Sequence, residues 1–89
     1  MLTKVLELRA LGGHRMHVRL NKGSAGSHDF AVMVAEPGPM LEPLRDPAYF
    51  ARGFLEFGAP TWPNGFDIAP EWLRREMQAA GEPSRDAAE

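Results

Sequence analysis

The sequence lacks cysteine, contains a single tyrosine, and has no apolar run of the roughly 18 to 20 residues that a membrane-spanning helix needs. Without cysteine the chain forms no disulfide, no thiolate zinc site and no thiol nucleophile, so packing alone must hold its core. The apolar stretch at the start of the chain is too short for a secretory signal peptide. We therefore expect a cytoplasmic protein that does not enter a membrane.

The chain is also short, at 89 residues, which leaves room for one hydrophobic core and no second domain. We expect a single domain over residues 1–81. Residues 82–89 are polar and lack large apolar side chains, which predicts a disordered tail. Because a small chain buries a small fraction of its surface, a partner or a second copy that covers apolar surface would stabilise it.

The net charge of −2 is unevenly distributed along the chain. Residues 1–22 hold five basic side chains and one acidic one, a net charge of +4, whereas residues 23–89 hold five basic and eleven acidic side chains, a net charge of −6. Two explanations are open. The basic part is either a solvated sheet face rich in arginine or a surface that attracts an oppositely charged partner.

Two segments near the N-terminus alternate apolar and polar residues, which is the pattern of a half-buried strand. Residues 4–11 and residues 15–20 both show it, and Gly12-Gly13 between them predicts a tight hairpin turn. The side chains expected to face the core are Leu6, Leu8 and Ala10 in the first strand and Met16, Val18 and Leu20 in the second.

A third strand is expected within residues 24–34, where Phe30, Val32 and Val34 would form its buried side. Residues 36–43 contain three prolines and a glycine, so we expect an ordered loop there.

The second half of the chain predicts two short helices that each begin at a proline. Asp46 is a good N-cap before Pro47, and Pro70 suits the first position of the last helix. That helix should place Leu73 and Met77 on one face before it ends near Gly81.

Residues 54–57 read as a further strand, with a sharp turn at residues 63–65. The order of elements predicts an α+β fold: a small antiparallel sheet of three N-terminal strands, plus one or two short later strands, with two short helices packed on it.

The most distinctive residues are aromatic and lie in the second half of the chain. We take Trp62, Asn64, Phe66 and Trp72 as candidate partner-binding residues. The alternative is that the two tryptophans supply much of the core of so small a protein. Both interpretations remain open from the sequence.

A second candidate surface is basic. Arg9, Arg15, Arg19 and Lys22 could share the outer face of the sheet and contact phosphates, since alternate residues of paired strands lie on one side. The acidic remainder of the chain argues against general nucleic-acid binding, so we expect such contacts only within a complex.

We find no catalytic, cofactor or metal site in the sequence. His14 and His17 are three residues apart on a strand and should face opposite sides, and His28 has only Asp29 beside it. Asp67 and Glu71 stand where a helix-capping and a first-turn carboxylate are favoured, so we give both a structural role.

Residues 43–73 resemble the C-terminal half of the small bacterial proteins grouped as domain-of-unknown-function family 2442. The matching features are the Pro-Leu-Arg-Asp-Pro run at residues 43–47, the Trp-Pro-Asn-Gly turn at residues 62–65 with Asp67 after it, and the proline-started last helix. The family has an Asp-Gly turn after its second strand, where this chain has Lys22-Gly23. The resemblance implies an α+β fold without established catalytic activity, and an antitoxin-like role beside a small toxin-like partner.

Three hypotheses follow. The first is a protein-binding module that uses a sheet edge or the Trp62 region, with a toxin-like neighbour or a second copy as its partner. The second is a nucleic-acid-associated regulator that contacts phosphates through the basic N-terminal strands. The third is an enzyme whose site the sequence does not reveal.

Overall fold

The computed structural model of the chain describes residues 2–81 and the backbone of residues 84 and 85. The regular elements are β1 (Val5–Gly12), β2 (Arg15–Leu20), β3 (Ser24–Asp29), α1 (Ala31–Val34), a 3-10 turn (Pro43–Arg45), α2 (Pro47–Phe50), β4 (Phe54–Glu56), β5 (Ala59–Thr61), α3 (Pro70–Ala79) and β6 (Ser84–Arg85). The α+β fold class is confirmed.

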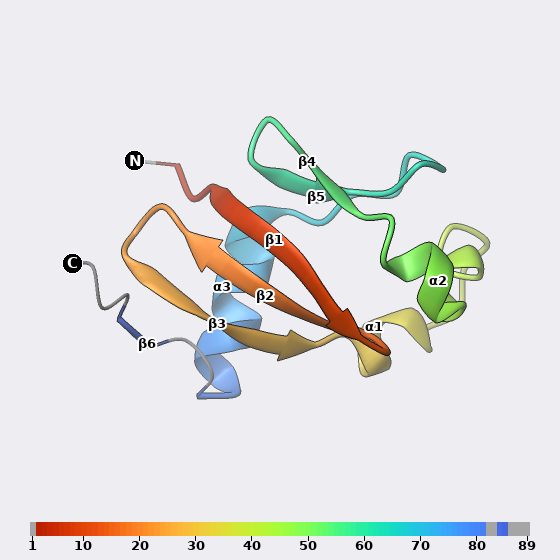
Figure 1. Cartoon of the computed structure of the whole chain (residues 1–89), viewed down its shortest axis with the longest axis horizontal. Coiled ribbons are helices and arrows are strands. Elements are labelled where there is room, and N and C mark those ends of the chain that lie inside the picture. The colour runs from red at the N-terminus through yellow and green to blue at the C-terminus, as the bar shows by residue number, and fades with distance from the viewer. Residues whose placement is uncertain (1, 82–83, 86–89) are drawn as a thin grey trace.

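The main sheet is antiparallel, with the order β1-β2-β3-β6. Figure 1 shows α3 crossing behind this sheet, while the opposite face is open toward the viewer. The two later strands do not join the main sheet; β4 and β5 pair with each other and form a hairpin beside β1. The short β6 pairs with the start of β3. The disordered tail expected over residues 82–89 otherwise falls on residues outside the described part of the chain.

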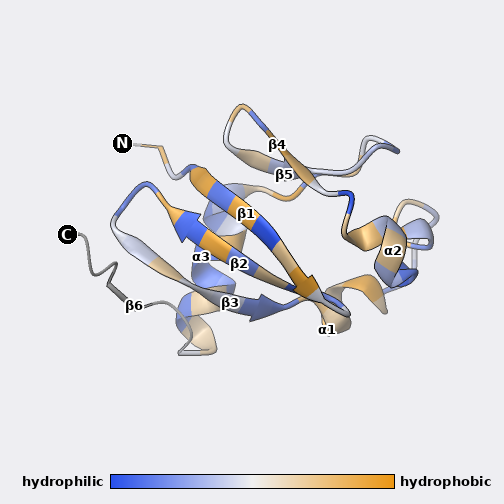
Figure 2. Cartoon of the chain, viewed as in Figure 1, coloured by the Kyte–Doolittle hydropathy of each residue, from blue (hydrophilic) through white to orange (hydrophobic). Residues whose placement is uncertain are grey.

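The face of the sheet that meets α3 carries the core. The alternation expected in β2 is confirmed, because its inward residues are buried and its basic residues face away, and Figure 2 shows the matching change of hydropathy along the strand. Among the described residues, twelve buried side chains form one cluster. They are Val5, Met16, Val18, Leu20, Phe30, Val34, Leu44, Phe50, Trp62, Ile68, Leu73 and Met77.

In β1, Ala10 lies on the expected face, opposite the buried Met16, but is itself exposed. The pattern expected for this strand is wrong at Leu6, which is 48% exposed. The reason is an irregularity in the pairing with β2, because Val5 lies opposite Leu20 but Glu7, two residues on, lies opposite Arg19. Such a β-bulge leaves an extra residue without a partner and shifts the side chains that follow. Val5 consequently belongs to the core, Leu8 packs against it, and Leu6 turns outward.

The third strand is shorter than expected, and its predicted second half is a helix. β3 ends at Asp29, whose carboxylate accepts a hydrogen bond from the Ala31 amide at 2.9 Å, and Phe30 is the N-cap of α1. Phe30 and Val34 are buried because residues four apart share one face of a helical turn, whereas Val32 is 81% exposed. The expectation that Val32 belongs to the buried side is therefore wrong.

The helix starts that the sequence predicts are confirmed. Asp46 accepts a hydrogen bond from the Ala48 amide at 3.0 Å, and Pro47 occupies the first turn of α2. Pro70 begins α3, in which Leu73 and Met77 are fully buried. Arg45 fixes the end of α1, since its guanidinium donates to the backbone carbonyls of Val34 and Glu36, both at 2.7 Å.

Candidate functional site

Trp62 is a core residue and not a surface contact, which corrects its place among the partner-binding candidates. Its side chain is 1% exposed and packs between Phe50 and Phe66. The indole nitrogen donates to the Phe50 carbonyl at 2.8 Å, so the one polar atom of the ring is satisfied inside the core. Nothing of this side chain is left for a partner.

Asn64 holds the turn that follows Trp62. Its amide nitrogen donates to the Met40 carbonyl at 3.0 Å, and its amide oxygen accepts from the Phe66 amide at 3.1 Å. Both ends of the side chain are thus used to join this turn to the proline-rich loop. These hydrogen bonds give Asn64 a structural role, while the partner contact that the sequence suggests for it stays a prediction.

Phe66 and Trp72 are different, because both are half-buried and both line a hollow in the surface. This hollow, of about 300 Å³, lies where the segment before α3 passes α1, and Met33, Ile68 and Ala69 complete its largely apolar wall. Two of the four candidates therefore meet at one site. Sequence reasoning missed Met33, because the segment that carries it was expected to be a strand.

A second hollow of about 410 Å³ adjoins the first, since Met33 and Trp72 line both. It runs between α1 and α3, with the exposed Val32 on one side and Ala79 and Ala80 on the other. We call the two hollows together the α1–α3 groove. Trp72 lies where the two hollows meet, so a ligand in either hollow would contact its side chain.

The rim of the α1–α3 groove is acidic. Asp67 lines the first hollow, and Asp29, Glu36 and Glu76 line the second. Among the described residues that line the groove there is no lysine or arginine. Asp67, Glu36 and Glu76 would attract a positively charged segment and disfavour a negatively charged one, whereas the Asp29 carboxylate accepts from the Ala31 amide and lies opposite Arg15.

The N-terminal basic residues form a separate surface on the open face of the sheet. Arg15 and Arg19 point away from the core on β2, and Arg9 lies opposite His17 of the same face. Lys22 lies apart, in the turn between β2 and β3. The structure therefore brings three of the four predicted phosphate-contacting residues to one face.

Carboxylates lie among these arginines. Glu7 is opposite Arg19 in the sheet, and its oxygen lies 3.7 Å from the Arg19 side chain and 3.4 Å from the ring of His17. Asp29 is opposite Arg15. The positive charge of this face is thus partly offset within the chain, which weakens it as a phosphate-binding surface.

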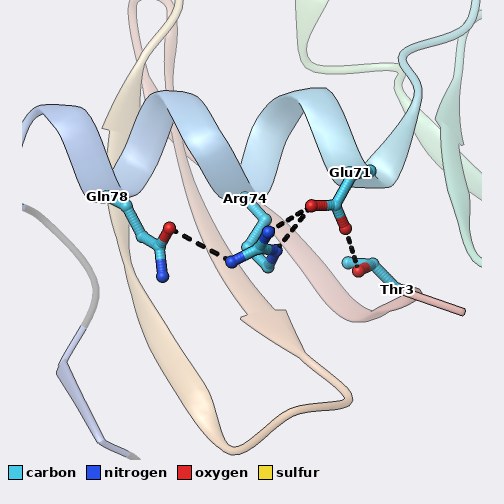
Figure 3. Close-up of polar contacts among 4 residues, drawn as sticks. All are labelled: Thr3, Glu71, Arg74 and Gln78. Atoms are coloured by element: carbon cyan, nitrogen blue, oxygen red, sulfur yellow. Dashed lines mark hydrogen bonds and ion pairs between the residues drawn. The ribbon is translucent and has the colours of Figure 1, made fainter. Parts of the chain in front are cut away.

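Glu71 has the structural role expected of a first-turn carboxylate in α3. It accepts hydrogen bonds from Thr3 and from Arg74, and Arg74 also donates to Gln78 at 3.1 Å (Figure 3). The hydrogen bonds from Arg74 and Thr3, with the charges of Arg74 and Lys22, lower the pKa of Glu71 from 4.5 to about 2. A carboxylate held ionised in this way is a poor proton acceptor at neutral pH.

Asp67 does not cap α3, which corrects its predicted role. The N-cap of this helix is Ala69, which makes no side-chain cap. Asp67 instead pairs through its backbone with Thr61, and this exposed residue lines the first hollow of the groove.

The histidines lie in three different environments. His14 contacts the Leu44 carbonyl at 3.0 Å, His17 lies beside Glu7 on the open face, and His28 packs edge-on against Phe30. Within the described residues, no group of three or more His, Cys, Asp or Glu side chains is placed to hold a metal ion.

No protein-family model, curated protein or solved structure matches this chain. The resemblance to family 2442 therefore stays a prediction. In the part of the chain that the structure describes, no helix is long and apolar enough to cross a membrane.

Proposed function

We propose that this chain is a protein-binding module, and that the α1–α3 groove receives a segment of a partner protein with a bulky apolar side chain flanked by lysine or arginine. The observation that carries the proposal is the combination of Trp72, half-exposed in an apolar hollow, with carboxylates on its rim. Binding energy in protein interfaces concentrates in aromatic residues that become fully buried, while surrounding charges select the partner.

The resemblance to family 2442 suggests which partner to test first. We propose an antitoxin-like role, in which the groove binds a small toxin-like protein encoded beside this gene. This part of the proposal rests on the residues shared with the family and not on the geometry of the groove. An enzymatic role finds less support, since the carboxylates at the groove surround an apolar floor.

The test is co-expression of the chain with the products of its neighbouring genes, followed by affinity purification and titration calorimetry. Trp72→Ala should weaken the complex by about 30-fold or more, because truncating an interface anchor costs about 2 kcal/mol or more. Glu76→Lys should slow association and reduce its dependence on salt. Arg75→Ala, on the same helix and outside the groove, is the matched control and should bind like the wild type.

A complex whose affinity is unchanged by both Trp72→Ala and Glu76→Lys would refute the groove as the binding surface. Absence of any complex with the neighbouring gene products would refute the antitoxin-like role and leave the groove to be tested with other partners.

One observation favours a second function, which is the side-by-side placement of Arg9 and the two β2 arginines on the open face of the sheet. A nucleic-acid-associated regulator would use these residues to contact phosphates. Its binding would weaken steeply with salt and would be lost in the double variant Arg15→Ala with Arg19→Ala. Binding that survives either change would rule this function out.

A further inference from the structure

The tip of the β4–β5 hairpin carries an aromatic residue that the fold does not require. Phe57 is 95% exposed and has a φ of +52°, and the following Gly58 has a φ of +79°. A two-residue hairpin turn with both φ values positive favours Asn-Gly, and a bulky residue in its first position is strained. Strain of this kind, in a large apolar side chain left in water, is a reason to look for a function.

The tip is held firmly against the start of the chain. The Val5 amide donates to the Gly58 carbonyl at 2.8 Å, and a side chain added at Gly58 would meet the side chain of Lys4 at 2.9 Å. Leu2, 79% exposed, joins Lys4 and Phe57 around one hollow. We call Leu2, Lys4 and Phe57 the hairpin knob: it offers bulky apolar side chains beside a positive charge.

We infer that the α1–α3 groove of one copy receives the hairpin knob of a second copy, so that the chain forms a two-fold symmetric dimer. The knob has the chemistry that the groove fits, since Phe57 would meet the apolar wall with Trp72 while Lys4 meets Asp67. This inference rests on the proposed function, because it uses the same groove.

The placement of knob and groove on the molecule favours two-fold pairing. Ala69 lines both the hollow beside the knob and the first hollow of the groove, so the two surfaces are neighbours. A two-fold interface requires a patch that contains both complementary parts, and an axis near Ala69 would join each knob to the other groove. The Lys4 and Asp67 contact would then occur twice.

The charged groups around this contact are few. Glu71 also lines the hollow beside the knob, but it is already engaged by Thr3 and Arg74 (Figure 3). Lys4 is therefore the basic side chain of the knob that remains to pair with Asp67, and the interface gains one opposite-charge contact on each side.

The experiment is sedimentation velocity of the purified chain over a wide range of concentration, with tryptophan emission recorded in parallel. Trp72 lines the groove and Trp62 is buried, so a change of emission on self-association would report Trp72. We expect a monomer–dimer equilibrium. Phe57→Asn should raise its dissociation constant at least about tenfold, since it removes the anchor while asparagine suits the turn.

The charge contact has its own test. Lys4→Glu and Asp67→Lys should each weaken the dimer, and the two changes combined in one chain should restore it. A chain that stays monomeric at every concentration, a dimer unaffected by Phe57→Asn, or a double variant no better than either single one would overturn the inference. Open-ended polymers would overturn the two-fold arrangement.

These results separate the dimer from the proposed function. Phe57→Asn leaves the groove intact, so a monomeric variant that still binds the partner protein supports both. If the chain forms no dimer but binds the partner protein in a way that depends on Trp72, only the dimer is refuted. If Trp72→Ala does not change the affinity for the partner protein, the groove is refuted as the partner site, whatever the oligomeric state.

Discussion

Gly53 lies so close to the indole of Trp62 that there is no room for a side chain, which predicts that Gly53→Ala destabilises the fold. A Cβ at this position would lie 2.9 Å from Cε2, 3.0 Å from Cζ2 and 3.1 Å from Nε1 of the indole. The φ of Gly53 is outside the left-handed region, so an alanine would suffer from the ring and not from its own backbone.

The indole has little room to move away. It packs against Phe50 and Phe66, and its nitrogen is fixed to the Phe50 carbonyl at 2.8 Å. Overpacking a tight core costs about 1 to 3 kcal/mol, and stretching the hydrogen bond adds up to about 1 kcal/mol. Replacing glycine also reduces the conformational entropy of the unfolded chain, which stabilises the fold by about 0.4 to 1 kcal/mol. These ranges give a net loss of about 0 to 3.5 kcal/mol, with a middle value of about 2 kcal/mol.

The measurement is urea unfolding followed by tryptophan fluorescence in a Trp72→Phe background, so that Trp62 alone reports. Gly53→Ala should lower the free energy of unfolding and change the native emission of Trp62.

Gly13→Ala is the matched control, because a Cβ there meets nothing within 4 Å while the φ of +58° strains it. It should cost about 1 kcal/mol through the backbone alone and leave the Trp62 signal unchanged. If Gly53→Ala is as stable as the parent chain, with unaltered native emission, the close contact between Gly53 and Trp62 is wrong.

Two further predictions concern helix starts. Because the folded pKa of Glu71 lies near 2, below its usual 4.5, its contribution to stability should be present above pH 4.5 and lost as the pH falls toward 2. The difference in urea midpoint between wild type and Glu71→Gln should shrink over that range. Glu76→Gln, on the same helix, is the control. A difference that does not depend on pH would contradict an ionised Glu71 held by Arg74 and Thr3. Asp46→Ala should lower the unfolding free energy by about 1 kcal/mol, since it removes the cap on the Ala48 amide, and Asp46→Asn should restore most of it in the same unfolding assay.

The sequence predicts well those parts of the fold that depend on one local rule. The alternation in β2 follows from a period of two, and the burial of Leu73 and Met77 follows from a spacing of four. The starts of α2 and α3 follow from Pro47 and Pro70. In each case neighbours along the chain suffice to fix the element.

The parts of the fold that were predicted wrongly depend on contacts between segments, which the pattern of apolar and polar residues does not contain. The outward turn of Leu6 comes from a bulge that is defined only by the pairing of β1 with β2. Val32 is exposed because Asp29 begins a helical turn where β-branched residues favoured a strand. A competing local hydrogen bond decided that case against the intrinsic preference of the side chains.

The candidate site also depends on contacts that cannot be predicted from neighbours along the chain. Phe66 and Trp72 could be chosen from the sequence because they belong to its most distinctive aromatic cluster, but that reasoning chose Trp62 as well. What separates the two tryptophans is the Phe50 carbonyl and the closeness of Gly53, neither of which a sequence pattern expresses. Met33 joined the groove only because α1 is a helix.

The core offers a reason to look for function at the groove and the hairpin knob. Its cluster closes without Leu2, Val32 or Phe57, so these side chains add nothing to burial where they stand. Single exposed apolar residues are common on protein surfaces and need no explanation. Here, however, Val32 lines the second hollow of the groove, while Leu2 and Phe57 line the hollow beside the knob, which meets the first hollow of the groove at Ala69. An arrangement of this kind gains stability only when another surface covers it, and for that reason the groove and the knob should be tested in the same set of variants.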